Sequence, residues 1–294
     1  MRISVAISLF ILSACASDPS KSTMLRFSTY NIRLDTASDG ENAWPNRKDS
    51  VTSLMQFYAP DVFGMQEVRQ NQLAELKSRL NAYDFVGVGR DDGREGGEFS
   101  SLAFRRDRFE LVGQGTFWLS STPNEPSIGW GAAFPRIVTW AHLKERQSGA
   151  VILVLNTHWD HAEHRARLES GRLIRQWIGA NRAPCESVVL LGDFNATPEE
   201  DSYGKLVEPG DSALADAMNR SETPPFGPIG TFNGFDIESA PSEAIDHIFV
   251  SKGVRILRHG TITQQEAGRL PSDHYPVIVD ALVPNCEKRI ASAG

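Results

Sequence analysis

A carboxylate and a carboxamide follow a strongly apolar segment in the second half of the chain. Residues 188–191 are Val-Val-Leu-Leu, Gly192 comes next, and Asp193 and Asn195 follow two positions apart. Because successive side chains of a strand point to opposite faces, this spacing places both polar groups on one side of the backbone. Such groups can bind a hard cation or orient a water molecule. The other interpretation is an Asx turn, in which Asp and Asn bond only their own backbone.

Further polar side chains stand at or just beyond the ends of other apolar segments. They are Asn31, Glu67, His158, Asp160, Asp246, Asp273 and His274. The simplest arrangement in which they all meet is a β-sandwich whose strand ends gather at one pole. Glu67 is the hardest to explain without a partner, because a lone buried carboxylate is costly. Taken singly, Asp246 and Asp273 also fit turns or helix caps, and His158 also fits a core histidine.

Short apolar segments must position these residues. Strands are predicted over residues 25–32, 61–67, 85–89, 98–104, 109–118, 136–143, 151–158, 188–191, 245–250 and 276–283. Apolar residues at helical spacing predict helices over 45–58, 70–80 and 162–179. The composition does not break between residues 24 and 283, and we find no internal repeat. The pattern predicts one α/β domain of packed sheets with helices on their outer faces.

Six short motifs occur in the order and rough spacing of a known family. They are Tyr30-Asn31-Ile32, Gln66-Glu67-Val68, Asn156-Thr157-His158-Trp159-Asp160, Gly192-Asp193-Phe194-Asn195, Ile245-Asp246-His247-Ile248 and Ser272-Asp273-His274-Tyr275-Pro276. With them the chain resembles the endonuclease/exonuclease/phosphatase superfamily, and residues 44–47 and 230–235 resemble a bacterial, exported subgroup of it. The resemblance implies a DNase I-like, four-layered α/β sandwich of two mainly antiparallel sheets flanked by helices. It also implies divalent-metal-dependent hydrolysis of a phosphoester.

A site for this reaction must neutralise charge while it activates a water, because a phosphoester is anionic and repels hydroxide. Glu67, supported by Asn31, offers hard oxygen ligands for Mg²⁺ or Mn²⁺. Asp273 and Asp160 complete the metal-ligand set that we predict. The His158-x-Asp160-His161 cluster could suggest zinc, but the carboxylate and amide set suits Mg²⁺ better.

The remaining residues are expected to act on the water and the phosphoryl group. Asp193 would orient and deprotonate the attacking water, and Asn195 would bond a phosphate oxygen. His158 and His274 would donate hydrogen bonds to the phosphoryl oxygens. Two carboxylates would each fix one histidine tautomer and a guanidinium would add positive charge at the phosphate. These three supporting residues are Asp246, Glu98 and Arg136.

The overall charge of the chain limits the classes of substrate that we expect. The 294 residues carry a net charge of −7 with a pI near 5.6, so strong electrostatic binding of nucleic acid is not expected. We expect a monomer that hydrolyses a small phosphodiester or an exposed headgroup. Alternatives are a phosphomonoesterase acting on a sugar or lipid phosphate, an extracellular nuclease, or a catalytically silent binding module. Aromatic side chains that could line a substrate pocket are Trp44, Trp118, Trp130, Trp159 and Phe235.

The N-terminus predicts export. Residues 3–12 are apolar but too short to span a bilayer, which is typical of a secretory signal. Residues 12–15, Leu-Ser-Ala-Cys, resemble a bacterial lipobox, so we predict a signal peptide over 1–15 and a lipid on Cys15. This lipid would anchor the protein to a membrane, with the protein facing the periplasm or the exterior. The alternative is cleavage that releases a soluble protein. The further divisions are a polar tether (16–23), the catalytic domain (24–284) and a tail (285–294).

Two cysteines remain after Cys15. In an oxidising compartment Cys185 and Cys286 could form a disulfide, or they could be two free thiols. Cys185 precedes the strand that leads to Asp193, and Cys286 follows the strand that leads away from His274. If the two polar residues share one pole, both sulfurs must lie near the opposite one.

Overall fold

Two six-stranded β-sheets face each other in the computed structural model, which describes residues 22–285. Their orders are β11-β12-β1-β2-β4-β3 and β5-β6-β7-β8-β10-β9. The strands are β1 (Ser22–Asn31), β2 (Val62–Val68), β3 (Tyr83–Val86), β4 (Phe99–Arg105), β5 (Phe109–Trp118), β6 (Ile137–Glu145), β7 (Val151–His158), β8 (Ser187–Asp193), β9 (Leu214–Asp216), β10 (Asp246–Ser251), β11 (Arg255–Thr261) and β12 (Val277–Pro284). Each sheet has one parallel pair, β1 with β2 and β7 with β8, and its other pairs are antiparallel.

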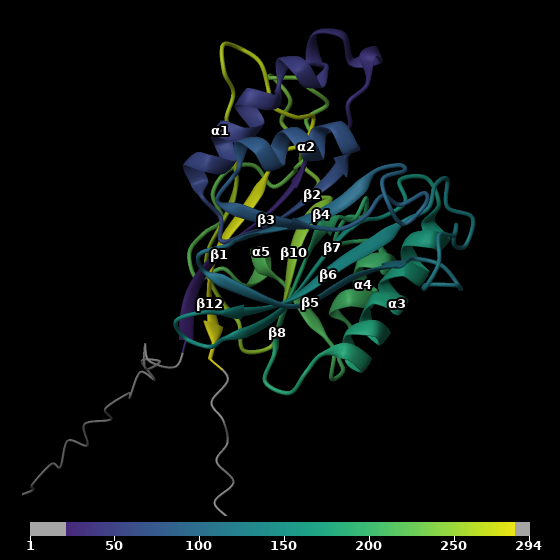
Figure 1. Cartoon of the computed structure of the whole chain (residues 1–294), viewed down its shortest axis with the longest axis vertical. Helices are drawn as coiled ribbons and strands as arrows, with labels where there is room; N and C mark the ends of the chain where they lie inside the picture. The colour runs from purple at the N-terminus through teal and green to yellow at the C-terminus, as the bar shows by residue number, and fades with distance from the viewer. Residues whose placement is uncertain (1–21, 286–294) are drawn as a thin grey trace, which may run out of the picture.

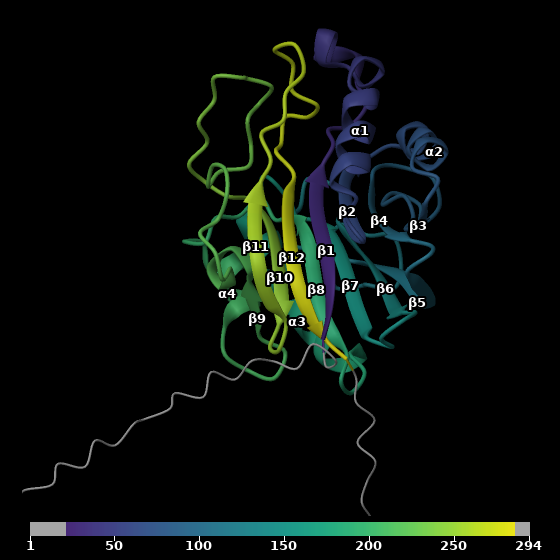
Figure 2. The same ribbon diagram turned by 90° about the vertical axis from the view of Figure 1, so that its left-hand side faces the viewer.

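Helices cover the outer faces of the sheets (Figures 1 and 2). They are α1 (Lys48–Tyr58), α2 (Gln70–Arg79), α3 (His164–Asn181) and α4 (Asp201–Val207). The short helix α5 (Ala217–Arg220) instead contacts β9 and β10 of one sheet and β11 of the other, and 3₁₀ turns lie at Ala37–Asn42 and Trp44–Asn46. Apolar side chains of α1 and α2 pack in one buried cluster with the outward residues of β1 and β2, such as Phe63. Side chains of α3 and α4 pack with outward residues of β7 and β8, such as Leu190. The predicted four-layered α/β sandwich is confirmed.

A polar bridge joins the two sheets within a largely apolar interior. Gln66 of β2 donates from Nε2 to Asn156 Oδ1 of β7 at 2.6 Å, and Asn156 donates to the backbone oxygens of Met65 and Ser101. The close approach requires Gly64, because a Cβ there would lie 2.5 Å from Asn156 Oδ1. Buried hydrogen bonds of this kind specify how the sheets are positioned relative to each other. They lie next to Glu67, so the bridge also positions the strand ends.

Strand direction brings the polar residues to one pole. Asn31 and Glu67 stand at the ends of the parallel strands β1 and β2, and His158 of β7 is in register with Asp193 of β8. Strand β10 runs opposite to β8 and begins at this pole, where Asp246 pairs with Asp193. Strand β12 runs opposite to β1 and also begins there. Both ends of the described chain leave from the other pole (Figure 2).

Several details differ from the sequence-based expectation. Ser22 and Thr23, which we assigned to the tether, form the first residues of β1. Elements α4, β9, α5 and β11 were not predicted; β11 is rich in Arg and contains Gly260, and its register with β12 shifts, which hides the strand alternation. Cys185 is exposed before the start of β8, whereas the signal peptide, Cys15 and Cys286 lie outside the described residues, so the disulfide stays a prediction.

Within residues 22–285, no helix has the length and apolar character needed to cross a bilayer.

Candidate active site

A cleft of about 600 Å³ opens where the strand ends meet. Predicted site residues that line it are Glu67, Glu98, Arg136, His158, Asp193, Asn195, Asp273 and His274. Asn31 and Asp246 are buried beneath it and are hydrogen-bonded to lining residues. Asp160 lies apart from the lining. The structure therefore gathers almost the whole predicted set from segments that are far apart in the sequence.

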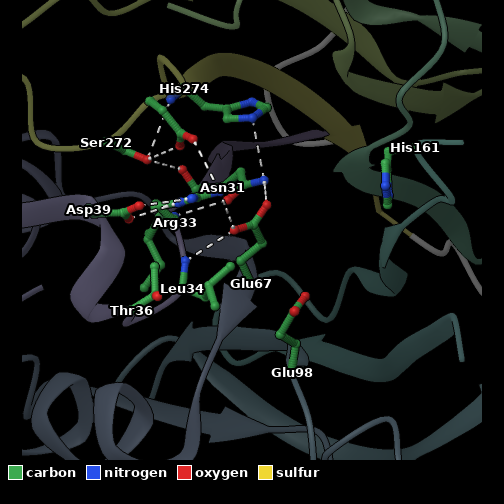
Figure 3. A network of polar contacts seen from close by, with 12 residues as sticks. Asn31, Arg33, Leu34, Thr36, Asp39, Glu67, Glu98, His161, Ser272 and His274 are labelled. Atoms are coloured by element: carbon green, nitrogen blue, oxygen red, sulfur yellow. Dashed lines mark hydrogen bonds and ion pairs between the residues drawn. The ribbon is translucent and has the colours of Figure 1, made fainter. Parts of the chain in front are cut away.

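Asn31 connects the two sheets at the floor of the cleft. Its Nδ2 donates to Glu67 Oε1 at 3.0 Å and to Asp193 Oδ2 at 2.9 Å, and it lies 3.5 Å from His274 Nε2. Figure 3 shows Asn31 between Glu67 and His274, with Glu98 and His161 set apart from this row. The Oδ1 atom of Asn31 accepts the backbone N–H of Arg33 at 3.0 Å. In this arrangement the Asn31 amide group orients the two carboxylates, and its oxygen is bound to a backbone N–H.

Three lining residues have left-handed backbone conformations. These are Arg33, Glu67 and Asn195, with φ of 58°, 61° and 46°. Non-glycine residues adopt such angles at a cost of about 1 kcal/mol or more, and they cluster at functional sites. At Glu67 the register between β2 and β4 shifts, and Glu67 Oε2 accepts the backbone N–H of Leu34 at 3.1 Å. The backbone turns just beyond the strands and so directs these side chains into the cleft.

Asp193 lies between two imidazole rings. Its Oδ2 is 3.6 Å from His158 Nε2 and 3.7 Å from His274 Nε2, and its Oδ1 accepts the backbone N–H of Asn195 at 3.0 Å. Burial raises the pKa of Asp193, and the neighbouring carboxylate of Asp246 raises this pKa further. A raised pKa suits a carboxylate that must accept a proton from water.

The two histidines differ in their partners and in charge. His274 donates from Nδ1 to Asp246 Oδ2 at 2.8 Å. Burial alone would lower the pKa of His274, but Asp246 and Asp193 outweigh burial and raise it well above its usual value. Burial lowers the pKa of His158 well below its usual value, and the cationic Arg136 and Arg90 lower it further. His274 is therefore the cationic ring and His158 the neutral one.

Two predicted roles are corrected. Asp160 does not face the cleft as a metal ligand, because its oxygens accept Arg136 Nε at 3.2 Å and the backbone N–H groups of Ala133, Ala162 and Glu163. It positions Arg136 and the start of α3. Glu98 does not fix a tautomer of His158, because both its oxygens bind Arg90 at 2.9 and 2.8 Å. Among the described residues His158 Nδ1 has no hydrogen-bond partner.

The aromatic lining also differs from the prediction. Trp44, Trp118 and Trp159 are buried in the core, at 1%, 5% and 0% exposure. Phe134 and Phe232 line the cleft instead, at 48% and 49% exposure. Both stand in irregular loops rich in Gly and Pro, where no periodic signal marks an aromatic residue as exposed. Other lining residues that were not predicted as site residues are Arg33, Arg69, Arg90 and His161.

Comparison with known proteins agrees with the motifs. Residues 28–274 match the model of the Endonuclease/Exonuclease/phosphatase family. The chain belongs to this family. A crystal structure of an endonuclease/exonuclease/phosphatase family protein from Bacteroides thetaiotaomicron is similar, with 36% identity and a TM-score of 0.85, covering 89% of this chain and 98% of that one. The chain therefore has the fold of this family as well as its motifs.

Two further proteins are similar to this chain over different shares of its length. A mannosyl-6-phosphatase from Bacteroides thetaiotaomicron is 37% identical with a TM-score of 0.82, covering 87% of this chain and 99% of that one. An uncharacterised protein of Acanthamoeba polyphaga mimivirus is 28% identical over 159 residues, which cover 52% of this chain. The match spans 59% of the length of the viral protein.

Family enzymes generally use divalent metal ions, and the acidic groups of the cleft fit one. Glu67, Asp193 and Asp273 line the same cleft, and Arg33 lies 4.0 Å from Glu67 and 3.8 Å from Asp273. Burial raises the pKa of Asp273 and Glu67 raises it further, although His274 and Arg33 oppose this shift. Ligand atoms of Asp193, Asp246 and His274 also lie within 4.8 Å of one another, but this group could hold an ion only with His274 deprotonated. Hard oxygen donors predominate, as Mg²⁺ requires.

Proposed function

We propose that this protein is a divalent-metal-dependent hydrolase of small phosphoesters and that a sugar phosphate is its first candidate substrate. The observation that carries the proposal is Asp193, buried between His158 and His274 at the floor of a cleft that Glu67 also lines. A carboxylate with a raised pKa beside two imidazole donors suits water activation and stabilisation of a phosphoryl transition state.

Each residue has a role that follows from its contacts. Asp193 accepts a proton from the attacking water, and His274, held by Asp246, donates from Nε2 to a phosphoryl oxygen. His158 donates to a second oxygen. Glu67 and Asp273 would hold a Mg²⁺ or Mn²⁺ ion, which when bound neutralises negative charge on the phosphoryl group. The water oxygen forms a bond to phosphorus while the bond to the leaving-group oxygen breaks, and that oxygen keeps the electron pair and takes up a proton from solvent.

Two features favour a sugar phosphate monoester over the diester that the sequence favoured. A phosphate monoester carries close to two negative charges near neutral pH, and Arg33, Arg69 and Arg136 line the cleft. The similarity to a mannosyl-6-phosphatase extends over almost the whole of that chain. A small diester stays the alternative, and the experiment below separates the two.

We also propose that the protein is an exported, monomeric lipoprotein anchored through Cys15. Strand β1 is ten residues long, so Ser22 lies roughly 30 Å from Asn31 at about 3.3 Å per residue. A lipid on Cys15, a few residues before Ser22, would leave the cleft facing away from the anchoring membrane. This orientation favours a soluble substrate over a headgroup of the same membrane. Labelling with radioactive palmitate, compared with a Cys15→Ser variant, tests the anchor.

The test of the proposed function is hydrolysis by the purified protein with Mg²⁺ or Mn²⁺. We expect phosphate release from mannose 6-phosphate and p-nitrophenyl phosphate, weaker activity on bis-p-nitrophenyl phosphate, and no activity in an Asp193→Asn variant. Preference for the bis-ester would restore the diester alternative. Absence of hydrolysis of every phosphoester by a folded, metal-supplied protein would contradict the proposal and support a silent binding module.

A further inference from the structure

An ion pair forms the wall of the cleft that lies across from Asn31. Arg90 and Glu98 bind each other through two contacts, Nη2 to Oε1 at 2.9 Å and Nη1 to Oε2 at 2.8 Å. Their side chains are 8% and 12% exposed, and both line the cleft. Among the described contacts, neither forms a hydrogen bond or an ion pair with Asp193 or the two histidines. The two planar groups together present both donors and acceptors next to the reaction centre.

Hydrogen bonds within a hairpin and from Trp118 hold the segment that carries this pair. Residues 89–98 form a hairpin in which Arg90 N donates to Glu98 O at 3.0 Å and Asp91 N donates to Gly96 O at 3.0 Å. The buried indole of Trp118 donates from Nε1 to Arg90 O at 2.7 Å. The pair is therefore positioned before any substrate arrives, which lowers the entropic cost of binding.

An exposed aromatic ring adjoins the pair. The guanidinium carbon of Arg90 lies 5.0 Å from the centroid of the Phe134 ring, and His161 stacks on that ring at 6.3 Å. Phe134 is about half exposed and lines the cleft. An apolar ring beside a few fixed polar groups is the usual composition of a site for a small molecule. Aromatic rings supply apolar contact area at low entropic cost.

We propose that Arg90, Glu98 and Phe134 form a leaving-group subsite that binds the hydroxylated sugar of the substrate. A hydroxyl group both donates and accepts, so it can bond the carboxylate and the guanidinium together. A phosphate oxygen mainly accepts, and the Glu98 carboxylate repels it. The phosphoryl group therefore binds beside Asp193 and His274, and the sugar extends onto the hairpin wall. This subsite rests on the proposed function, whose substrate class it specifies.

The test removes the hydrogen-bonding pair without leaving an unpaired buried charge. An Arg90→Met/Glu98→Leu double variant replaces both groups with apolar side chains of similar size. Its matched control is Arg94→Met/Glu95→Leu, which alters the exposed tip of the same hairpin. Each protein is assayed with mannose 6-phosphate and with p-nitrophenyl phosphate, whose leaving group has no hydroxyl except the one released. Circular dichroism and thermal unfolding check the fold.

We expect kcat/KM for mannose 6-phosphate to fall about 10–100-fold in the double variant, mainly through KM, because a site built for hydroxyl groups loses them. With p-nitrophenyl phosphate the change should stay within about threefold, and the control should match the wild type on both substrates. Equal losses on the two substrates would overturn the subsite, since the pair would then serve the phosphoryl group or the fold. An unchanged rate on mannose 6-phosphate would overturn it as well.

A binding measurement separates failure of the subsite from failure of the proposed function. If the wild type hydrolyses neither substrate, the proposed function fails. Calorimetric titration with mannose 6-phosphate then compares the wild type with the Arg90→Met/Glu98→Leu variant. Binding at least about tenfold weaker in the variant supports the subsite, and equal or absent binding overturns it.

Discussion

Replacing Asp246 with asparagine removes one negative charge beside His274 and changes little else in shape. Asp246 Oδ2 accepts the Nδ1–H of His274 at 2.8 Å, and the two side chains are 0% and 5% exposed. The amide oxygen of asparagine can still accept this hydrogen bond. The substitution therefore isolates the charge of Asp246 from the orientation that it gives to His274.

The expected effect follows from Coulomb's law. Opposite unit charges 2.8 Å apart attract by up to about 6 kcal/mol at an effective dielectric constant of about 20. Without the carboxylate, burial favours the neutral form of His274, and the positive charge that faces the phosphoryl group is lost. Part of this energy is offset by the desolvation that the charge pair requires. We expect kcat to fall roughly 10²–10⁴-fold, since each 1.36 kcal/mol is about tenfold in rate.

The chain contains a matched control for this variant. Asp216 Oδ2 also lies 2.8 Å from a histidine Nδ1, that of His247, and both residues are buried. His247 does not line the cleft; its Nε2 faces the backbone oxygens of Ala196 and Ala244. Asp216→Asn should thus reduce stability without a comparable loss of turnover per folded molecule.

The assay measures kcat with saturating Mg²⁺ or Mn²⁺ and saturating p-nitrophenyl phosphate, on fractions shown to be folded by circular dichroism and urea unfolding. Asp246→Asn retaining more than about a tenth of the wild-type kcat would refute the electrostatic role of this residue. Equal losses of kcat in Asp246→Asn and Asp216→Asn would also refute it, because only one of the two histidines faces the cleft.

Three further predictions concern the metal, acid stability and a buried carboxylate. EDTA should abolish activity, and Glu67→Gln should raise the Mg²⁺ concentration needed for half-maximal rate; full activity after exhaustive EDTA treatment would rule out metal dependence. Burial lowers the pKa of His259 from 6.5 to about 4, so the unfolded chain binds a proton below pH 6.5 that the folded chain binds only below about pH 4. Stability should therefore fall as pH drops through this window, by about 2 kcal/mol at pH 5 for this residue, and urea unfolding of His259→Gln should lack that part of the loss. Asp160→Ala leaves the buried Arg136 guanidinium without its carboxylate and should lower the unfolding free energy by about 3–5 kcal/mol; a loss below about 1 kcal/mol in urea unfolding would show that Asp160 is not needed to hold it.

The strands that carry the site were predictable because each is a short apolar segment with a polar residue at its end. The segments ending at Asn31, Glu67, His158 and Asp193 all form strands, and the structure brings those ends together. Strand β11 could not be recognised, since charged residues and a register shift interrupt its alternation. Whether a strand is present depends there on pairing with β12, which is a non-local interaction.

The roles of Glu98 and Asp160 were misjudged for a related reason. Both residue types fit the predicted chemistry, but a carboxylate binds whichever donor the fold places nearest. For Glu98 that donor is Arg90 across a hairpin, and for Asp160 it is Arg136 together with three backbone N–H groups. Neither pairing could be predicted from regular spacing of residues in the sequence.

The chemistry of the site could be predicted from short sequence motifs, because their polar residues are rarely buried without a partner. A buried carboxylate or amide at a strand end needs a partner, so the motifs around Asp193 and Glu67 pointed to a polar centre before any contact was known. Which groups face one another was settled by the packing of two sheets. Parallel and antiparallel neighbours place Asp246 opposite Asp193, and the loops that follow the strands place Phe134 and Phe232 on the cleft walls. Loop residues follow no regular spacing in the sequence, and their positions depend on long-range packing. The lining of the cleft walls was therefore visible only in the folded chain.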